Sequence, residues 1–386
     1  MGNVVEKQQT VLAICYDFDK TLSPTDMQAQ GFIQSIDCEV ADFWKESNIL
    51  ADENEMDQNL AYMYLMAKKS REKNQPLTRK TLREAGAKVE LFPGVETWFE
   101  RLNEYGRQKG ILVEHYVISS GLKEMVEGSR ISKQFQKIYA SSFCFNDEDE
   151  VIWPAQVVNY TNKTQFLFRI EKGVLDINDQ GVNSYYEPNQ YRVPFRNMVY
   201  IGDSDTDIPC MKLVNTNGGH AIGVYNPETQ NKTKVYRMLQ ENRIRFFEAA
   251  DYSEDSKLET LVKQIIDRTA ANEVLEQAHF NCVGETEQEV AAKSEMELEK
   301  ERLINELEES MNFRSTHKVI RGLEKVTDWS LEQKMKLIHI ANVNNQVRFI
   351  LGDSDVKRFY TKICNGIEDV EADVVRKGCG IASSDK

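Results

Sequence analysis

The sequence is short of the residues that build disulfide scaffolds and membrane spans. Its seven cysteines are scattered, odd in number and without a C-x-x-C pair, which favours reduced thiols over disulfides or structural zinc. No apolar run approaches the roughly 20 residues that cross a bilayer. The N-terminal segment lacks the apolar core of a signal peptide, and Glu6 stands where a myristoylation signal has Ser or Thr. We therefore expect a cytoplasmic protein without a membrane partner.

Basic residues are also too few to suggest a nucleic-acid partner. The formal net charge is −14, from 62 acids and 48 Lys and Arg residues, and phosphate backbones are bound by clustered Lys and Arg. Much of the surplus lies in residues 284–312, which hold ten acids and three bases. The five histidines show no metal-ligand spacing. The excess negative charge therefore says little about the substrate, and any metal site has to come from carboxylates.

Short apolar runs that end in polar or glycine-rich turns predict buried parallel strands at residues 11–19, 112–121, 197–205 and 220–225. Helical patterns follow the second and third of these runs. This alternation predicts an α/β fold with helices on both faces of the sheet. In such a fold the ligand lies beyond the carboxyl ends of the strands. Residues 141–160 read as a hairpin with an acidic turn.

A helical insertion separates the first strand from the rest of the sheet. Residues 25–90 show helical patterns and no convincing strand, and they follow directly after an acidic strand end. We interpret them as a cap over the site, with an ordinary helical subdomain as the alternative. The predicted catalytic core is then 8–24 together with 91–268. Residues 272–386 form a further helical region whose role the sequence does not indicate.

Carboxylates and a hydroxyl follow the predicted strand ends. Asp17 and Asp19 lie two residues apart, so both would point the same way if the strand continued through them. One acid can then attack a substrate while its neighbour transfers protons. Ser119, followed by Gly121, offers a hydroxyl and backbone amides suited to holding phosphate oxygens. Ser120 is the alternative to Ser119.

The stretch MVYIGDSDTDIP, residues 198–209, adds two further acids at a third strand end. Asp203 and Asp207 are hard oxygen ligands of the kind that Mg²⁺ prefers, whereas we read Asp205 as a turn former. A lysine is needed to neutralise phosphoryl oxygens, and Lys163 begins a helical pattern. Lys172 is the alternative, although its place at a helix end suits a role as a partner of the helix dipole.

In chain order, this set resembles the four motifs of the haloacid dehalogenase-like (HAD) hydrolases. The motifs are Asp17-Phe18-Asp19-Lys20-Thr21, Ser119, Lys163 and Gly202-Asp203-Ser204-Asp205-Thr206-Asp207. Their spacing is most similar to the phosphoserine phosphatase-like branch, which carries a helical cap between the first two motifs. The resemblance covers about residues 8–268. It implies a HAD-type, Rossmann-like parallel sheet with an inserted helical cap, here followed by additional C-terminal helices.

The resemblance also implies roles for these residues. Asp17 would be the nucleophile that forms an aspartyl-phosphate, and Asp19 would act as general acid and then as general base. Ser119 and Lys163 would hold the phosphoryl group. The implied Mg²⁺ ligands are Asp17, the backbone carbonyl of Asp19, and Asp203, with Asp207 supporting the metal site.

These roles predict a Mg²⁺-dependent phosphatase acting on a small phosphorylated metabolite. Asp19 favours a phosphatase over a dehalogenase, which needs no proton transfer at that position. A phosphomutase is one alternative. Another is a binding or regulatory protein of the same fold that acts through its C-terminal helices. Residues 272–386 would then contact a protein partner or a second copy of the chain.

The letters GDSD return at residues 352–355. There the residue four beyond Asp353 is Lys357, a positive charge where the first copy has its second acid. We therefore predict that Asp353 or Ser354 caps a helix and binds no metal. A capping box, Ser330 with Gln333, is predicted to open the preceding helix.

Overall fold

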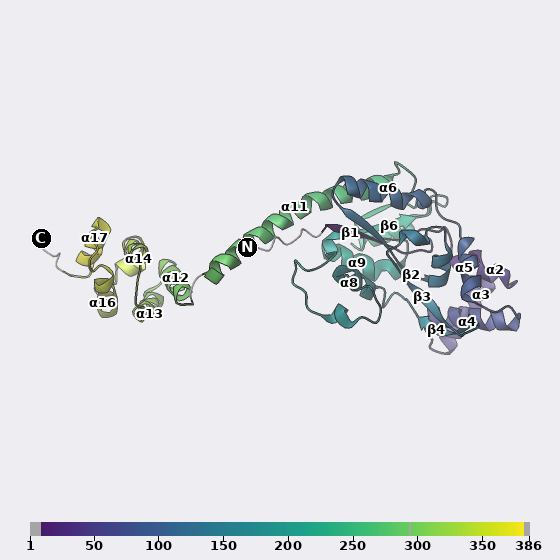
Figure 1. Ribbon diagram of the computed structural model, residues 1–386, viewed down its shortest axis with the longest axis horizontal. Helices are drawn as coiled ribbons and strands as arrows, with labels where there is room; N and C mark the ends of the chain where they lie inside the picture. Colours follow the sequence, from purple (N-terminus) through teal and green to yellow (C-terminus); the bar gives the residue numbers. More distant parts are fainter. Residues whose placement is uncertain (1–8, 293–294, 382–386) are drawn as a thin grey trace. The chain divides into compact units, whose positions relative to one another are not determined.

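The computed structural model describes residues 9–292 and 295–381. Two compact units make up the chain, and the division falls between Ala278 and His279, within helix α11 (Lys257–Ala292). Figure 1 shows the helices and strands of each unit. Among the described residues, two buried apolar clusters lie in the first unit and one lies in the second. Within the described ranges, no helix is both long enough and apolar enough to span a bilayer.

The first unit is built on a seven-stranded sheet in the order β4-β3-β2-β1-β5-β6-β7. All neighbouring strands are parallel except β3 and β4, which pair antiparallel. The expected α/β fold is confirmed. The strands are β1 (Val11–Tyr16), β2 (Leu112–Leu122), β3 (Lys137–Phe145), β4 (Val151–Gln156), β5 (Met198–Gly202), β6 (His220–Tyr225) and β7 (Phe246–Ala249).

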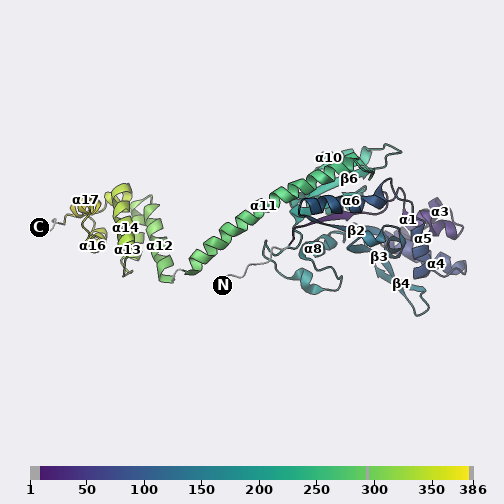
Figure 2. The same ribbon diagram turned by 45° about the horizontal axis from the view of Figure 1, so that its top comes forward.

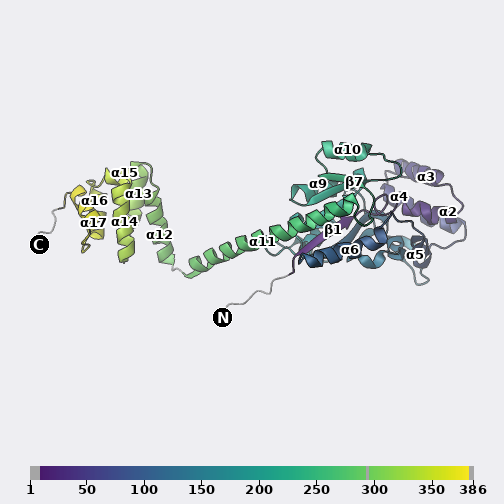
Figure 3. The same cartoon turned by 90° about the horizontal axis from the view of Figure 1, so that it is seen from above.

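Helices cover both faces of this sheet, and strand β1 shows why. All six of its residues are buried, and they alternate between two cores, with Leu12, Ile14 and Tyr16 on one face. Helix α6 (Val95–Gln108) and the start of α11 pack on that face. Helices α8 (Thr164–Lys172), α9 (Ile208–Thr216) and α10 (Thr233–Gln240) pack on the other. Figure 3 shows α9 and α10 on the opposite side of the sheet from α6. Burial on both faces explains the continuous apolar runs of the central strands.

The structure corrects the bounds of predicted strands and adds one strand that was not predicted. The first strand was expected to reach residue 19 but ends at Tyr16, because the chain turns directly afterwards. Strand β3 begins at Lys137, before the predicted hairpin, and its first residues pair parallel with β2. Strand β7 was missed. It has four residues and is partly exposed at the sheet edge, so its sequence carries little periodic signal.

A helical insert lies between β1 and α6, as expected (Figure 2). Its helices are α1 (Met27–Gln30), α2 (Phe32–Ser35), α3 (Val40–Glu53), α4 (Gln58–Glu72) and α5 (Arg79–Ala87). Side chains of this insert, such as Phe43 and Met63, belong to the same apolar cluster as β1. The insert is therefore packed onto the sheet domain and shares its core. The first unit also contains α7 (Lys123–Gly128) and the 3₁₀ turns η1 (Ser132–Gln134), η2 (Gln180–Asn183), η3 (Phe195–Asn197) and η4 (Asp205–Asp207).

The second unit is helical in its described residues. Its helices are α12 (Glu295–Glu308), α13 (Phe313–Leu323), α14 (Leu331–Val343), α15 (Asn345–Arg348), α16 (Ser354–Ile363) and α17 (Val370–Gly378). The capping box of Ser330 and Gln333 at α14 is confirmed. Asp353 occupies the N-cap position of α16, as predicted, but its side chain caps no backbone amide. Its carboxylate lies 3.1 Å from Nε2 of His317 instead.

A buried hydrogen-bond chain fixes the protonation of His115 in β2. The Trp98 indole donates to the Tyr16 hydroxyl at 2.9 Å, and that hydroxyl lies 3.0 Å from His115 Nδ1. Nε2 faces the Asn103 oxygen at 3.0 Å. Because an amide oxygen only accepts, Nε2 carries the proton of the neutral ring and Nδ1 accepts from the Tyr16 hydroxyl. Burial lowers the pKa of His115 to about 3. The folded protein therefore keeps this ring neutral.

We predict that below about pH 6.5 the free energy of unfolding falls less steeply with pH in His115→Gln than in wild type. Below the unfolded-state pKa of about 6.5, unfolded His115 takes up a proton that the folded state refuses. Wild type should therefore lose about 1 kcal/mol per pH unit relative to the variant between pH 6 and 5. Urea unfolding at several pH values measures this difference. Parallel profiles for the two proteins would contradict a neutral, buried His115.

Candidate active site

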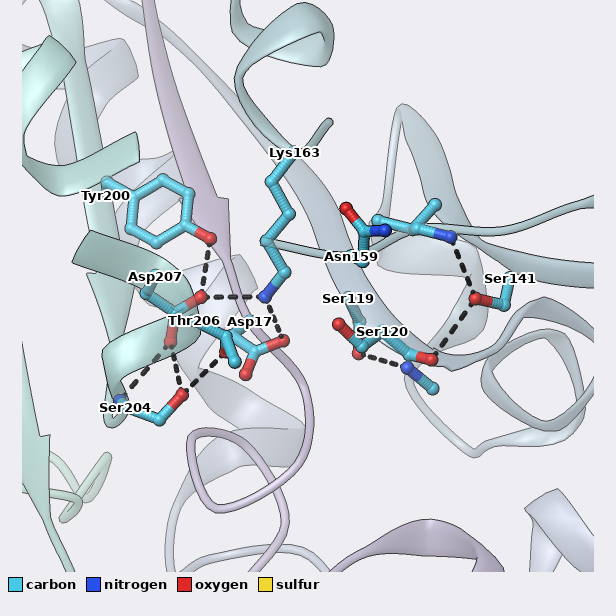
Figure 4. Close-up of polar contacts among 12 residues, drawn as sticks. Asp17, Ser119, Ser120, Ser141, Asn159, Lys163, Tyr200, Ser204, Thr206 and Asp207 are labelled. Carbon is cyan, nitrogen blue, oxygen red and sulfur yellow. Dashed lines mark hydrogen bonds and ion pairs between the residues drawn. The ribbon is translucent and has the colours of Figure 1, made fainter. Parts of the chain in front are cut away.

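A cavity of about 710 Å³ lies at the carboxyl ends of β1, β2 and β5. The core and the helical insert both contribute to its wall. The lining residues are Asp17, Asp19, Lys20, Asp26, Met56, Asp57, Gln58, Asn59, Ser119, Ser120, Asn159, Tyr160, Asp203, Ser204, Thr206 and Lys234. Four of the predicted site residues line the cavity, namely Asp17, Asp19, Ser119 and Asp203. Figure 4 shows the polar contacts around Asp17 and Ser119.

Asp17 enters the cavity because the sheet register places it there. Tyr16, the last residue of β1, is opposite Ile201 of β5, and the Asp17 amide donates to the Ile201 carbonyl at 3.0 Å. The chain then turns, with the Leu22 amide donating to the Phe18 carbonyl at 2.8 Å. The i, i+2 placement of Asp17 and Asp19 at the cavity is therefore produced by a turn and not by a continuing strand.

Lys163 lies between two of the carboxylates and is fully buried. Its Nζ lies 3.1 Å from Asp17 Oδ1 and 2.7 Å from Asp207 Oδ1 (Figure 4). Burial alone would lower the pKa of Lys163, but the charges of Asp17 and Asp207 outweigh it and hold that pKa above its ordinary value. The lysine is thus charged, and it joins the loop before α8 to the ends of β1 and η4.

Asp207 is also fully buried, and protein donors occupy both of its oxygens. Besides Lys163, Oδ1 accepts from the Tyr200 hydroxyl at 2.8 Å. Oδ2 accepts from the amide and hydroxyl of Ser204 at 3.3 and 3.2 Å. Gly202 makes room for this carboxylate, since a Cβ there would lie 2.6 Å from Oδ2. Asp207 is therefore placed to position Lys163 and to contribute charge near a metal.

Asp203 completes a cluster of three acids. Asp17, Asp203 and Asp207 each offer one carboxylate oxygen, and these oxygens lie within 4.8 Å of one another. Asp203 accepts no hydrogen bond from a side chain or amide within the described ranges. Burial, followed by the charges of Asp207 and Asp17, raises its pKa to about 8.

This cluster fits a divalent metal ion. Burial and then the Asp207 charge raise the pKa of Asp17 to about 6, even though Lys163 and the Phe18 amide act in the opposite direction. Crowded, desolvated carboxylates of this kind are costly unless a cation joins them. Mg²⁺ is commonly held by one or two carboxylates together with water and substrate phosphate, and Asp17 with Asp203 matches that number. The predicted Asp19 ligand is its backbone carbonyl, because its side chain is not part of the cluster.

The Asp19 side chain faces the helical insert. Its Oδ1 accepts the Met27 amide at 2.8 Å, and a Cβ on Gly121 would lie 3.1 Å from its Oδ2. Burial, and then the charges of Asp26 and Asp17, raise the pKa of Asp19 well above its usual value. A carboxyl group with a raised pKa can carry a proton at neutral pH, which suits a general acid.

Ser119 and Ser120 both line the cavity. Ser119 is almost fully buried, and its Oγ accepts the Gly121 amide at 3.1 Å, which leaves its hydroxyl proton free to donate. The Ser120 carbonyl accepts from the hydroxyls of Tyr62 and Ser141. The Gly121 amide was expected to contact phosphate, but in this structure it is already used by Ser119, and Gly121 is absent from the cavity wall.

Lys172, the alternative to Lys163, lies away from the cavity and donates to the carbonyls of Val182 and Ser184, at 2.7 and 2.6 Å. Asp205, which was read as a turn former, begins η4 and pairs with Arg237 of α10. It is not one of the three clustered acids. Neither contact involves the cavity acids.

Several residues at the site were missed in the sequence. Asn159 arranges the turn before Lys163, since its side-chain oxygen accepts the Thr161 amide at 2.9 Å. Its amide also donates to Asp57 of the insert at 2.6 Å. The polar run NYTNK is typical of such a turn and could have indicated it. Tyr200 sits within an apolar strand, where nothing local signals a hydrogen bond to Asp207.

A model of the haloacid dehalogenase-like hydrolases matches residues 14–212, just over half of the chain. The chain belongs to this family. The match includes every residue of the acid cluster, together with Ser119 and Lys163. The protein is therefore a HAD-family hydrolase, and its buried acid cluster suggests a divalent metal site.

Other similarities are more distant. An uncharacterised protein of Borreliella burgdorferi is 25% identical over 281 residues, which are 66% of this HAD hydrolase and 96% of that protein. A probable phosphoserine phosphatase from Vibrio cholerae is 13% identical with a TM-score of 0.43, covering 70% of this chain and 68% of that one. A HAD-family hydrolase from Salmonella enterica serovar Typhi is 14% identical with a TM-score of 0.41, covering 64% and 71%.

We predict that Lys163→Met destabilises this HAD hydrolase by about 3–5 kcal/mol, because removal of one partner leaves buried carboxylates unpaired. Lys172→Met, which loses two hydrogen bonds in a surface loop, should cost about 1 kcal/mol. Urea unfolding in a chelating buffer compares the two variants. Equal losses would contradict the central place given to Lys163.

The two serines allow a second comparison. Ser119→Ala should lower kcat/KM for hydrolysis of a phosphorylated substrate by about a hundredfold, the size of effect seen when one oxyanion donor is removed. Ser120→Ala should change it by less than about threefold, since only the backbone of Ser120 has a fixed contact. Steady-state kinetics decides between them. The reverse ranking would assign the phosphate contact to Ser120.

Proposed function

We propose that this HAD hydrolase is a Mg²⁺-dependent phosphatase that hydrolyses a small phosphomonoester through an aspartyl-phosphate on Asp17. The observation that carries the proposal is the placement of Asp17. Its carboxylate opens onto the cavity, is held by a buried lysine, and lies within 4.8 Å of the other two acids. Phosphoryl transfer depends chiefly on such positioning and charge stabilisation.

In the first step a carboxylate oxygen of Asp17 attacks phosphorus, and the bond from phosphorus to the ester oxygen breaks. The leaving oxygen takes a proton from Asp19, whose raised pKa supports its being protonated beforehand. Lys163 stabilises negative charge on the phosphoryl oxygens, and the Ser119 hydroxyl donates to one of them. An alcohol and phosphorylated Asp17 result.

In the second step water attacks the phosphorus of phosphorylated Asp17. Asp19, now ionised, accepts a proton from that water, and the phosphorus–carboxylate bond breaks. Inorganic phosphate leaves and Asp17 is regenerated. The Met27 amide holds Asp19 toward the cavity in both steps, at 2.8 Å from Oδ1, so the same carboxyl group serves as acid and then as base.

Asp17 and Asp203 would hold the Mg²⁺, with the Asp19 carbonyl as a third ligand and Asp207 supporting through its charge. The ion would supply Lewis-acid stabilisation of the phosphoryl oxygens. The protein's part is to fix the carboxylates, and Asp207 does so through Lys163, Tyr200 and Ser204.

The substrate is small in this proposal because the helical insert forms part of the cavity wall and bounds the space beside the acids. The Tyr62 hydroxyl donates to the Ser120 carbonyl at 2.8 Å, and Asn159 donates to Asp57 at 2.6 Å. These contacts join insert and core beside Asp17. A phosphomutase would pass the phosphoryl group from Asp17 to a second hydroxyl and not to water.

We predict that Asp17→Asn abolishes Mg²⁺-dependent phosphate release, because the nucleophile and a metal ligand are both lost. A fall of at least about 10⁴-fold in kcat is expected for loss of a covalent nucleophile. Phosphate release from a panel of small phosphomonoesters measures it. Adding excess EDTA to wild type should stop release, and adding Mg²⁺ should restore it.

Asp205→Asn is the matched control, since it removes an aspartate of the same GDSD segment that lies outside the acid cluster. It should retain release within about tenfold, and larger effects would point to its contact with α10. Turnover unchanged in Asp17→Asn would exclude Asp17 as the nucleophile. Phosphoryl transfer to an added acceptor alcohol, with little free phosphate, would favour the phosphomutase.

A further inference from the structure

The lysines at the cavity differ in how their charges are balanced. Lys20 lies 2.8 Å from Asp26 Oδ1, and buried Lys163 is held by the two acids described above. Lys234 lines the same cavity, is exposed, and has no hydrogen bond or ion pair with any residue in 9–292 or 295–381. Its ammonium group therefore offers unused donors to whatever enters the cavity.

An ion pair lies on the same face of α10 as Lys234. Lys234 lies in the first turn of α10, and Arg237, three residues later, pairs with Asp205 of η4. Residues three apart share a helix face, so this pair turns the face carrying Lys234 toward the GDSD segment. The Asp205 side chain thus has a role that the acid cluster does not give it.

The hydroxyls of Ser204 and Thr206 line the cavity from the GDSD segment, but both are engaged, since Ser204 donates to Asp207 and Thr206, 2.8 Å away, is left to donate to Ser204. The ammonium group of Lys234 remains available to a charged oxygen in the cavity.

The reacting phosphoryl group does not account for this arrangement, because Lys163 and Ser119 already serve it in the proposed mechanism. We propose that Lys234 binds a second anionic group of the substrate, either a carboxylate or a second phosphate, and so selects phosphomonoesters that carry one. This inference rests on the proposed function and adds a substrate class to it. The pair of Asp205 with Arg237 positions the selecting lysine.

Two matched substrate pairs test the inference with the full chain and Mg²⁺. One pair is 3-phosphoglycerate and glycerol 3-phosphate, which differ in a carboxylate. The other is fructose 1,6-bisphosphate and fructose 6-phosphate, which differ in a phosphate. In at least one pair, wild type should prefer the member with the additional anionic group by about tenfold in kcat/KM, as expected for a charged hydrogen bond. The pair that shows the preference identifies the anionic group.

Lys234→Met should remove that preference and leave kcat/KM for the less charged member within about threefold. Lys234→Arg should retain much of it, because the charge remains. Lys232→Met is the matched control, since Lys232 lies over the Tyr225 ring and is not part of the cavity wall. The preference should also weaken as salt is raised, because the lysine is exposed.

Equal losses on both members of each pair, or no preference in wild type, would overturn the inference while leaving Asp17-dependent turnover intact. A binding measurement covers the case in which no probe is hydrolysed and the phosphatase proposal fails. Calorimetry on Asp17→Asn with Mg²⁺ then compares the two members of each pair with and without Lys234→Met. Tighter binding of the member with the additional anionic group, lost in the double variant, supports the inference. Binding that is unaffected by Lys234→Met overturns it.

Discussion

The ammonium group of Lys163, enclosed between the carboxylates of Asp17 and Asp207, is the interaction on which the rest of the site depends. All three side chains are largely or fully buried, so none can rely on water for its charge. The three groups come from the end of β1, the loop before α8 and the turn η4. These segments must meet before any of the charges is compensated, which links the folding of the sheet to the assembly of the site.

That constraint explains details of the surrounding structure that otherwise look unrelated. Tyr200 points a hydroxyl at Asp207 from within an apolar strand, and Gly202 lacks the Cβ that would strike the same carboxylate. Asn159 shapes the turn that delivers Lys163. Even so, one lysine does not balance three acids, and burial together with the mutual repulsion of the acids raises the pKa values of Asp17 and Asp203. A divalent cation would relieve it, so the same crowding favours metal binding.

The helical insert and α10 approach this centre from different parts of the chain. The insert contributes Asp57 and Tyr62, whose hydrogen bonds to Asn159 and the Ser120 carbonyl join it to the core. On the core side, α10 is tied to the GDSD segment through Arg237. In the proposed function, the residues that react with the phosphoryl group and the residues that face the leaving group therefore come from separate elements. The C-terminal helices form their own core, and their sequence assigns them no role.

The α/β fold, the family and the residues at the strand ends could all be predicted from the amino-acid sequence, because buried parallel strands leave apolar runs that stop where polar side chains begin. The sequence also distinguished the two GDSD segments, since Lys357 replaces the second acid in the later copy. Contacts between residues far apart in the chain could not be predicted from the sequence. The turn that ends β1 at Tyr16, the contact of Asp207 with Tyr200 and the unpaired state of Lys234 depend on groups far apart in the chain. Only the tertiary structure decided these, because charge balance and burial belong to the assembled site and not to any one segment.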